Sequence, residues 1–157
     1  MKSFAIIIKS SETSELGYST LVESSKKVGN NFDINRFDAI TPNTYKQAML
    51  DFNISWNYPW RSEVLDFASG LKKKAYVTSN PENRIACAIS HYALWKKCVE
   101  LDEPILILEH DAFFIQKIDF NPKDVNFTIL GINNPLGVTR LSKVYYDIIL
   151  NNMSLYQ

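Results

Sequence analysis

The chain lacks an excess of either charge and lacks any long apolar run. Among its 157 residues, 17 lysines and arginines balance 17 aspartates and glutamates. A nucleic-acid-binding surface needs a basic excess, so nucleic acid is excluded as the main partner. A membrane-spanning helix needs about 20 consecutive apolar residues, and the sequence has no such run. We therefore expect no transmembrane segment, while peripheral contact with a membrane stays open.

Cysteine is also scarce, since the chain has only Cys87 and Cys98. Both fall in a segment with helical spacing, where eleven positions rise about 16 Å, too far for a disulfide. Cys87 and His91 are four positions apart on one helical face, but no second pair of ligands completes a zinc site, so zinc is not predicted. We expect both thiols to be reduced and buried. Reduced thiols and the lack of a signal peptide predict a cytoplasmic protein.

The spacing of apolar residues predicts strands that alternate with helices. Short apolar runs typical of strands occur at 4–8, 32–40, 105–108 and 126–132. Helical spacing occurs at 14–28, 45–52, 62–71, 80–101 and 139–152. This alternation predicts an α/β fold, with a mostly parallel central sheet flanked by helices. No linker divides the chain, so we expect a single domain over residues 1–157.

The start of the helix predicted at 80–101 has two candidate signals. Ser79 and Glu82 have the spacing of a capping box, whereas Asn80 and Pro81 offer a cap followed by proline at the first helical position. Both place the start near residue 80. The predicted apolar stripe of this helix consists of Ile85, Ala88, Ile89, Tyr92, Trp95 and Val99.

Two further clusters have both a functional and a structural interpretation. Trp56, Tyr58 and Trp60 could line a sugar or base site, because flat rings stack on both, but such clusters more often serve packing. The basic run 72–74 predicts a solvated face, and phosphate contact is the alternative.

The stretch PILILEHDAFF places two acids and a histidine where an aliphatic strand ends. Ligands of α/β sheets gather beyond the carboxyl ends of strands. If the extended geometry persists, Glu109 and Asp111 point to one side and His110 to the other. Two carboxylates on one side repel each other, and a hard cation such as Mg²⁺ or Mn²⁺ relieves that repulsion. An exposed turn without a ligand is the open alternative.

The segment IACAISHYALWKKCVELDEPILILEHDAFF resembles the signature region of the family 25 glycosyltransferases, the lipooligosaccharide-type galactosyltransferases and their relatives. The matching residues are Cys87, Ala88, Ser90, His91, Ala93, Leu94, Trp95, Lys96, Lys97, Ile107, Leu108, Glu109 and Asp111. The runs FAIII and FDAI resemble further strands of the family, so the resemblance covers residues 1–130.

This resemblance implies a GT-A-like, or Rossmann-like, nucleotide-sugar-binding domain. It also implies transfer of a sugar, often galactose, from a UDP-sugar to a glycan or lipid-linked glycan of lipooligosaccharide type, with inversion and with Mn²⁺ or Mg²⁺. The region that shapes the acceptor site in the family is short or missing here. The alternative is therefore a truncated or degenerate module that binds nucleotide or sugar without catalysis.

The resemblance also implies roles for particular residues. The metal ligands it implies are Asp111, Glu109 and His110, where His110 replaces the middle aspartate of the family pattern. An imidazole can still bind Mn²⁺. The residues it implies for binding the nucleotide-sugar are Glu109, Ser90, His91 and Lys9.

The catalytic base is not identified. An inverting transfer needs a group that takes the proton of the acceptor hydroxyl. The acids downstream of the motif, none of them distinguished by its context, are Asp119, Asp124 and Asp147.

Overall fold

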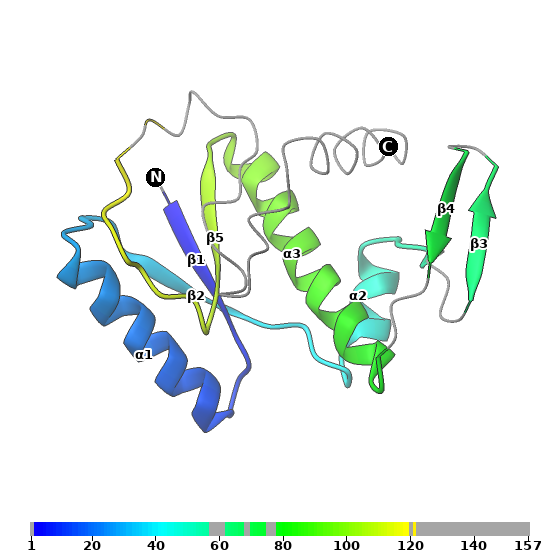
Figure 1. Ribbon diagram of the computed structural model, residues 1–157, viewed down its shortest axis with the longest axis horizontal. Coiled ribbons are helices and arrows are strands. Elements are labelled where there is room, and N and C mark those ends of the chain that lie inside the picture. The colour runs from blue at the N-terminus through cyan, green and yellow to red at the C-terminus, as the bar shows by residue number, and fades with distance from the viewer. Residues whose placement is uncertain (1, 57–61, 68–69, 75–77, 120, 122–157) are drawn as a thin grey trace.

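The computed structural model describes residues 2–56, 62–67, 70–74, 78–119 and 121, and Figure 1 shows their arrangement. In chain order the elements are β1 (Lys2–Ile7), α1 (Glu12–Lys27), β2 (Ile34–Asp38), α2 (Tyr45–Asp51), β3 (Glu63–Asp66), β4 (Leu71–Lys74), α3 (Pro81–Leu101) and β5 (Ile105–Glu109). The α/β class is confirmed. The strand predicted at 126–132 and the helix predicted at 139–152 lie outside the described residues.

The main sheet has three strands in the order β2-β1-β5, and both pairings are parallel. The predicted parallel sheet is thus confirmed for the part of the chain that is described. In the register of the sheet, Ile7 pairs with Asp38 of β2 and Ile6 pairs with Glu109 of β5. The carboxyl ends of all three strands therefore meet at one edge. The narrower prediction, a GT-A-like form of this class, stays a prediction.

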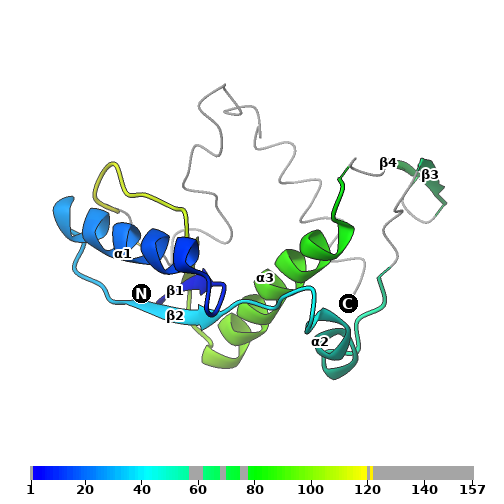
Figure 2. The same cartoon turned by 90° about the horizontal axis from the view of Figure 1, so that it is seen from below.

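Central strand β1 is covered on both faces, because successive side chains point to opposite sides of a sheet. Ala5 and Ile7 pack with Leu21 of α1. Phe4 and Ile6 pack with Leu94 of α3. Figure 2 agrees with these contacts, since α1 and α3 lie on opposite sides of the sheet. The result is a three-layer arrangement of helix, sheet and helix.

Helix α1 begins with a polar cap and contains a glycine that serves tertiary packing. The Ser11 hydroxyl accepts a hydrogen bond from the Ser14 amide at 3.3 Å. Gly17 weakens a helix by its own propensity. However, a Cβ atom at this position would lie 2.5 Å from the carbonyl oxygen of His110. The absence of a side chain at Gly17 therefore lets α1 approach the turn that follows β5.

Helix α3 uses the second of its two candidate starts. The Asn80 side chain accepts a hydrogen bond from the Asn83 amide at 3.3 Å, and Pro81 begins the helix. The helix ends at Leu101, and the next residue, Asp102, caps it with a left-handed φ of 48°. Asn80 and Pro81 thus define the start, and the capping-box alternative is not adopted.

The buried face of α3 differs from the predicted stripe. Its buried residues are Ile85, Ala86, Ile89, Ser90 and Leu94. Ala88 is exposed and Val99 is 80% exposed, so the stripe was wrong at these two positions. The reason is that α3 packs against both the sheet and α2. Leu94 faces the sheet, whereas Ile85 and Ile89 pack with Tyr45 of α2, and one straight stripe cannot serve both.

The predicted helix at 62–71 is wrong, because β3 and β4 form an antiparallel hairpin there. Gly70 has a φ of 69°, and its amide donates a hydrogen bond to the Asp66 carbonyl at 2.8 Å. This left-handed conformation, which glycine adopts without strain, closes the turn. Lys72 forms an ion pair with Glu63 at 3.1 Å across the hairpin. Turn chemistry at Gly70 thus outweighs the helical spacing.

Other expectations from the sequence concern the aromatic cluster, the basic run and the cysteines. Trp56 packs with the cluster between α2 and α3, as the packing interpretation predicts, while Tyr58 and Trp60 lie outside the described residues. The Lys72 side chain is 73% exposed, as expected for a solvated face. Both cysteines are free thiols, but Cys87 is exposed and Cys98 is only partly buried, so the expected burial is wrong at Cys87. Across the described ranges, no helix has the length and hydropathy needed to cross a membrane.

We predict that Gly17→Ala destabilises the fold although alanine is the better helix former. The added methyl group meets backbone atoms of His110, so either α1 or the turn after β5 must move. Overpacking of this kind costs about 1–3 kcal/mol, which exceeds the gain of about 1 kcal/mol from helix propensity. Urea unfolding of both proteins measures the difference.

The matched control for this variant is Leu16→Ala. Leu16 is the preceding residue of α1 and is 70% exposed. Leucine and alanine both favour helices, so Leu16→Ala should change the free energy of unfolding by less than about 0.5 kcal/mol. A Gly17→Ala chain that is more stable than the unsubstituted chain by about 1 kcal/mol, the full gain in helix propensity, would show that the turn yields without cost.

Candidate functional site

The order of the strands marks the edge at β1 and β5 as the expected place for a ligand. The chain passes from β1 through α1 to β2 on one side of β1, and later returns to pair β5 on the other side. In parallel α/β sheets, ligands bind beyond the carboxyl ends of the strands where the order reverses in this way. Glu109, the last residue of β5, lies at that edge.

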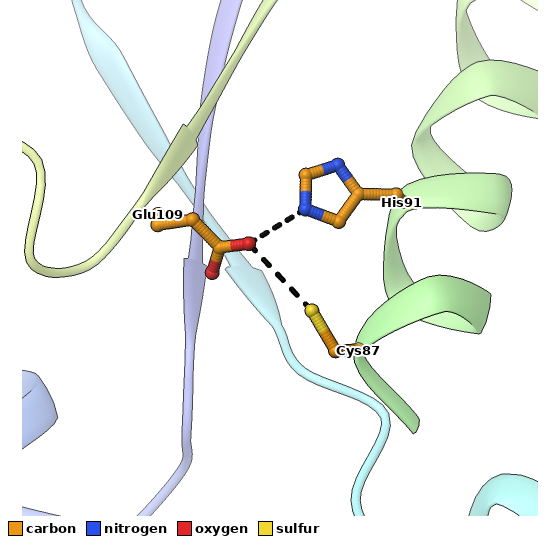
Figure 3. Close-up of side chains that lie close together, drawn as sticks. All are labelled: Cys87, His91 and Glu109. Atoms are coloured by element: carbon orange, nitrogen blue, oxygen red, sulfur yellow. Dashed lines mark hydrogen bonds and ion pairs between the residues drawn. The ribbon is translucent and has the colours of Figure 1, made fainter. Parts of the chain in front are cut away.

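Three polar side chains converge at this edge. Nε2 of His91 lies 2.6 Å from Oε1 of Glu109, and Sγ of Cys87 lies 3.8 Å from the same oxygen. Figure 3 shows the carboxylate of Glu109 reaching from β5 toward the two side chains of α3. We call Cys87, His91 and Glu109 the edge cluster.

The lengths of α3 and β5 explain why His91 meets Glu109. The two elements run in opposite directions and are joined by only three residues, 102–104. The ten steps from His91 to Leu101 rise about 15 Å along the helix. The four steps from Ile105 to Glu109 span about 13 Å along the strand. The two side chains therefore lie at nearly the same distance from the connecting loop.

Cys87 is the residue of the edge cluster that the sequence prediction left out of the site. It is one turn before His91 on α3, so the two side chains share a helix face. The signal that could have found the cluster was the combination of this spacing with the equal reach of α3 and β5. The missing third ligand was Glu109, which follows the pair by 18 residues and belongs to another element.

The edge cluster shifts the protonation of its members. Hydrogen bonds with the Cys87 sulfur and with the Glu109 carboxylate raise the pKa of His91 to about 9, against the opposing effect of burial. The hydrogen bond from His91 lowers the pKa of Glu109, and burial again opposes the shift. At neutral pH the pair is therefore an imidazolium and a carboxylate. Solvent reaches both, since the side chains are 30% and 41% exposed.

His110 and Asp111 lie in the turn after β5, and their side chains have different environments. The strand ends at Glu109, whose carbonyl accepts a hydrogen bond from the Ala112 amide at 3.0 Å. Glu109 points toward α3, whereas the His110 ring lies next to Gly17 of α1, so the expected alternation of sides holds for these two residues. Asp111 is exposed in the turn.

Within the described ranges, the edge cluster is the one group of three or more His, Cys, Asp or Glu residues whose ligand atoms lie within 4.8 Å of one another. His110 and Asp111 are not members of it. The metal-binding roles of Glu109, His110 and Asp111 as a set stay a prediction.

Ser90 is buried and has a structural role. Its hydroxyl donates a hydrogen bond to the Ala86 carbonyl at 2.8 Å and accepts one from the Ile40 amide at 2.9 Å. The bond with Ile40 connects α3 to the segment that follows β2, whereas the bond with Ala86 lies within the helix. The predicted contact of Ser90 with a nucleotide-sugar stays untested beside this role.

Lys9 lies just beyond the carboxyl end of β1, at the same edge of the sheet as Glu109. Its Nζ atom is 3.8 Å from Oδ2 of Asp38, and the two side chains are 79% and 62% exposed. An exposed pair of this kind contributes little to stability. The cation is therefore free to exchange its partner for a phosphate group, and its donor-binding role stays a prediction.

A separate hollow of about 410 Å³ lies between α2 and α3. The residues that line it are Phe37, Ile40, Ala48, Asp51, Phe52, Ala93, Lys96, Lys97 and Glu100. None of them belongs to the predicted site. The hollow does not coincide with the edge cluster, and chemistry rather than size identifies the candidate site.

The topology and the polar edge define a class, namely α/β proteins that bind a ligand beyond the carboxyl ends of parallel strands. Within this class, the family model for glycosyltransferase family 25 (LPS biosynthesis protein) matches residues 15–141. This match covers more than half of the chain, so the protein belongs to that glycosyltransferase family. The resemblance seen in the sequence is thereby confirmed. No curated protein and no solved structure gives a match.

We predict that the contact between His91 and Glu109 makes stability depend on pH. The raised pKa of His91 contributes stability that is complete below about pH 6.5 and is lost as the pH rises through about 9. The lowered pKa of Glu109 contributes stability that is complete above about pH 4.5 and is lost at lower pH. The contact between His91 and Glu109 should therefore contribute its full stability between about pH 4.5 and about pH 6.5.

Glu109→Gln tests this prediction. At pH 6 the variant should lose about 1–2 kcal/mol of unfolding free energy, a value reduced for the exposure of the pair, and the loss should shrink toward pH 9 and above. The pKa of His91, followed by NMR in a chain with two histidines, should fall. Glu100→Gln, which removes an exposed carboxylate from α3, is the control and should leave the titration of His91 unchanged.

Proposed function

We propose that this chain transfers a sugar, with galactose as the first candidate, from a UDP-sugar to a glycan or lipid-linked glycan, with inversion at the anomeric carbon. The family match over residues 15–141 carries the proposal. The parallel sheet, with Glu109 at its carboxyl edge, supports a nucleotide-sugar site in a GT-A-like domain. A cytoplasmic location belongs to the same proposal, as do peripheral membrane contacts with a lipid-linked acceptor.

The residues at this edge suit the donor in distinct ways. Lys9 would place a cation beside the diphosphate, since its present partner Asp38 holds it only loosely. Glu109 would contact the metal or the ribose. His91 is a positioning residue in this proposal, because its hydrogen bond of 2.6 Å fixes the direction of the Glu109 carboxylate.

The carboxylates of Glu109 and Asp111 would suit a hard divalent cation. Asp111 is exposed and follows Glu109 by two positions, so two oxygen ligands are available while other positions remain for water and phosphate. An imidazole can ligate Mn²⁺, but the His110 ring lies beside Gly17 of α1 and would have to turn to reach an ion held by Glu109. When bound, Mn²⁺ or Mg²⁺ would neutralise the negative charge of the leaving diphosphate.

The alternative function is binding of the nucleotide or the sugar without catalysis. It is favoured by the lack of an identified base, since Asp119 is exposed in the segment after β5, and Asp124 and Asp147 lie outside the described residues. Release of UDP in the presence of a galactose-terminated acceptor distinguishes the two. Donor binding without UDP release, over a panel of glycan acceptors, supports the binding module.

Asp111→Ala tests the metal-assisted donor site. We expect the affinity for UDP-galactose in the presence of Mn²⁺ to fall by more than about tenfold, the loss that even an outer-shell change can cause at a metal site. Affinity in the presence of EDTA should be unaffected. Isothermal titration calorimetry measures both values. Glu100→Ala removes an exposed acid elsewhere and should bind as the unsubstituted chain does. Unchanged Mn²⁺-dependent binding by Asp111→Ala would refute the assigned role.

His110→Asp tests the departure from the family pattern. A third carboxylate beside Glu109 and Asp111 should tighten Mn²⁺ binding by roughly tenfold, because affinity rises with the number of charged oxygen ligands. His110→Asn has nearly the same shape without the charge and should show no such gain. Equal Mn²⁺ affinity of these two variants, measured by titration, would mean that position 110 does not face the metal.

A further inference from the structure

The edge cluster has the ligand chemistry of a transition-metal site. It offers one sulfur, one imidazole nitrogen and one carboxylate oxygen, and these three atoms lie within 4.8 Å of one another. Two of the residues share a face of α3 and the third ends β5, so regular elements hold all three (Figure 3). We infer that Cys87, His91 and Glu109 bind a zinc ion. This inference does not depend on sugar transfer.

The distances between the side chains leave room for the ion after small movements. Tetrahedral zinc has bonds of about 2.3 Å to sulfur and about 2.0–2.1 Å to nitrogen and oxygen, which separates nitrogen from oxygen by about 3.3 Å and sulfur from oxygen by about 3.5 Å. The observed separations are 2.6 Å for His91 and Glu109, and 3.8 Å for Cys87 and Glu109. For these two pairs, side-chain rotations that move the ligand atoms by less than 1 Å reach the zinc geometry, and the third pair, Cys87 and His91, lies within 4.8 Å.

The arrangement of the hydrogen bonds also favours a cation. The sulfur of Cys87 and the ring nitrogen of His91 both point at a single oxygen of Glu109. One zinc ion at this point of convergence can replace both hydrogen bonds. The Cys87 thiolate and the Glu109 carboxylate then balance its two positive charges.

The sulfur of Cys87 makes the edge cluster selective for zinc. Thiolate and imidazole ligands favour Zn²⁺, whereas Mg²⁺ and Mn²⁺ favour oxygen. The zinc site is therefore distinct from the oxygen-rich site proposed around Asp111, although Glu109 belongs to both. Sequence spacing alone suggested only the pair of Cys87 and His91, and the fold supplies the third ligand.

The fourth coordination position of this zinc site is open. Cys87 is exposed, and His91 and Glu109 are partly exposed, so solvent can reach the ion. Three protein ligands with one open position are typical of catalytic zinc sites, whereas structural sites have four protein ligands. We expect water or a small anion such as phosphate at this position.

Titration of the full chain with Co²⁺, a spectroscopic substitute for Zn²⁺, tests the inference. The expected result is one Co²⁺ per chain with a thiolate-to-cobalt charge-transfer band, displaced by one equivalent of Zn²⁺. Cys87→Ser should remove the band and weaken Zn²⁺ binding by more than about 100-fold, because loss of a supporting residue alone costs about 10–100-fold. Zn²⁺ should also raise the melting temperature of the unsubstituted chain but not of this variant.

Cys98→Ser is the matched control. Cys98 is on the same helix, and its thiol donates to the Glu103 carbonyl at 3.2 Å, away from the edge cluster. This variant should keep the band and the affinity. A band that disappears in Cys98→Ser, or Zn²⁺ binding that is equally tight in Cys87→Ser, would overturn the site. Failure of the unsubstituted chain to bind either ion would overturn it as well, whereas failure of donor binding would bear only on sugar transfer.

Discussion

The fold depends on strand β1, which must satisfy its backbone and bury its side chains on both faces at once. Its peptide groups are paired with β2 and β5, because buried amides and carbonyls need partners. Ala5 and Ile7 require α1, while Phe4 and Ile6 require α3. Once these neighbours are in place, the parallel strands bring Asp38 and Glu109 to one edge. The position of the candidate site thus follows from packing.

At that edge, the carboxylate of Glu109 takes part in both proposed metal sites. Glu109 ends a strand that packs into the core, accepts a hydrogen bond from His91, and lies two positions before the exposed Asp111. A zinc ion held by Cys87 and a manganese ion held by Asp111 would both use Glu109 or lie near it. Two cations so close repel each other, so the occupancy of one site would lower the affinity of the other. The two metals are therefore expected to compete.

Local sequence signals were sufficient for some elements and insufficient for others. Apolar runs predicted β1, β2 and β5, and Asn80 with Pro81 predicted the start of α3, because these signals act within a few residues. The β3–β4 hairpin was missed because Gly70 decides the turn through its backbone conformation. The partnership of His91 with Glu109 was missed because it depends on how α3 lies against β5, which involves the lengths of two elements together.

The close contact between Gly17 and the carbonyl of His110 joins two parts of the chain that are far apart in sequence. No side chain at position 17 fills the gap, so backbone rests almost directly on backbone. Through such a contact a displacement of the turn after β5 passes directly to α1, whereas a flexible side chain between them would change its rotamer instead. If the turn after β5 moves when a ligand arrives, α1 has to move with it. A spectroscopic label on the exposed surface of α1 would then report a movement of the turn after β5.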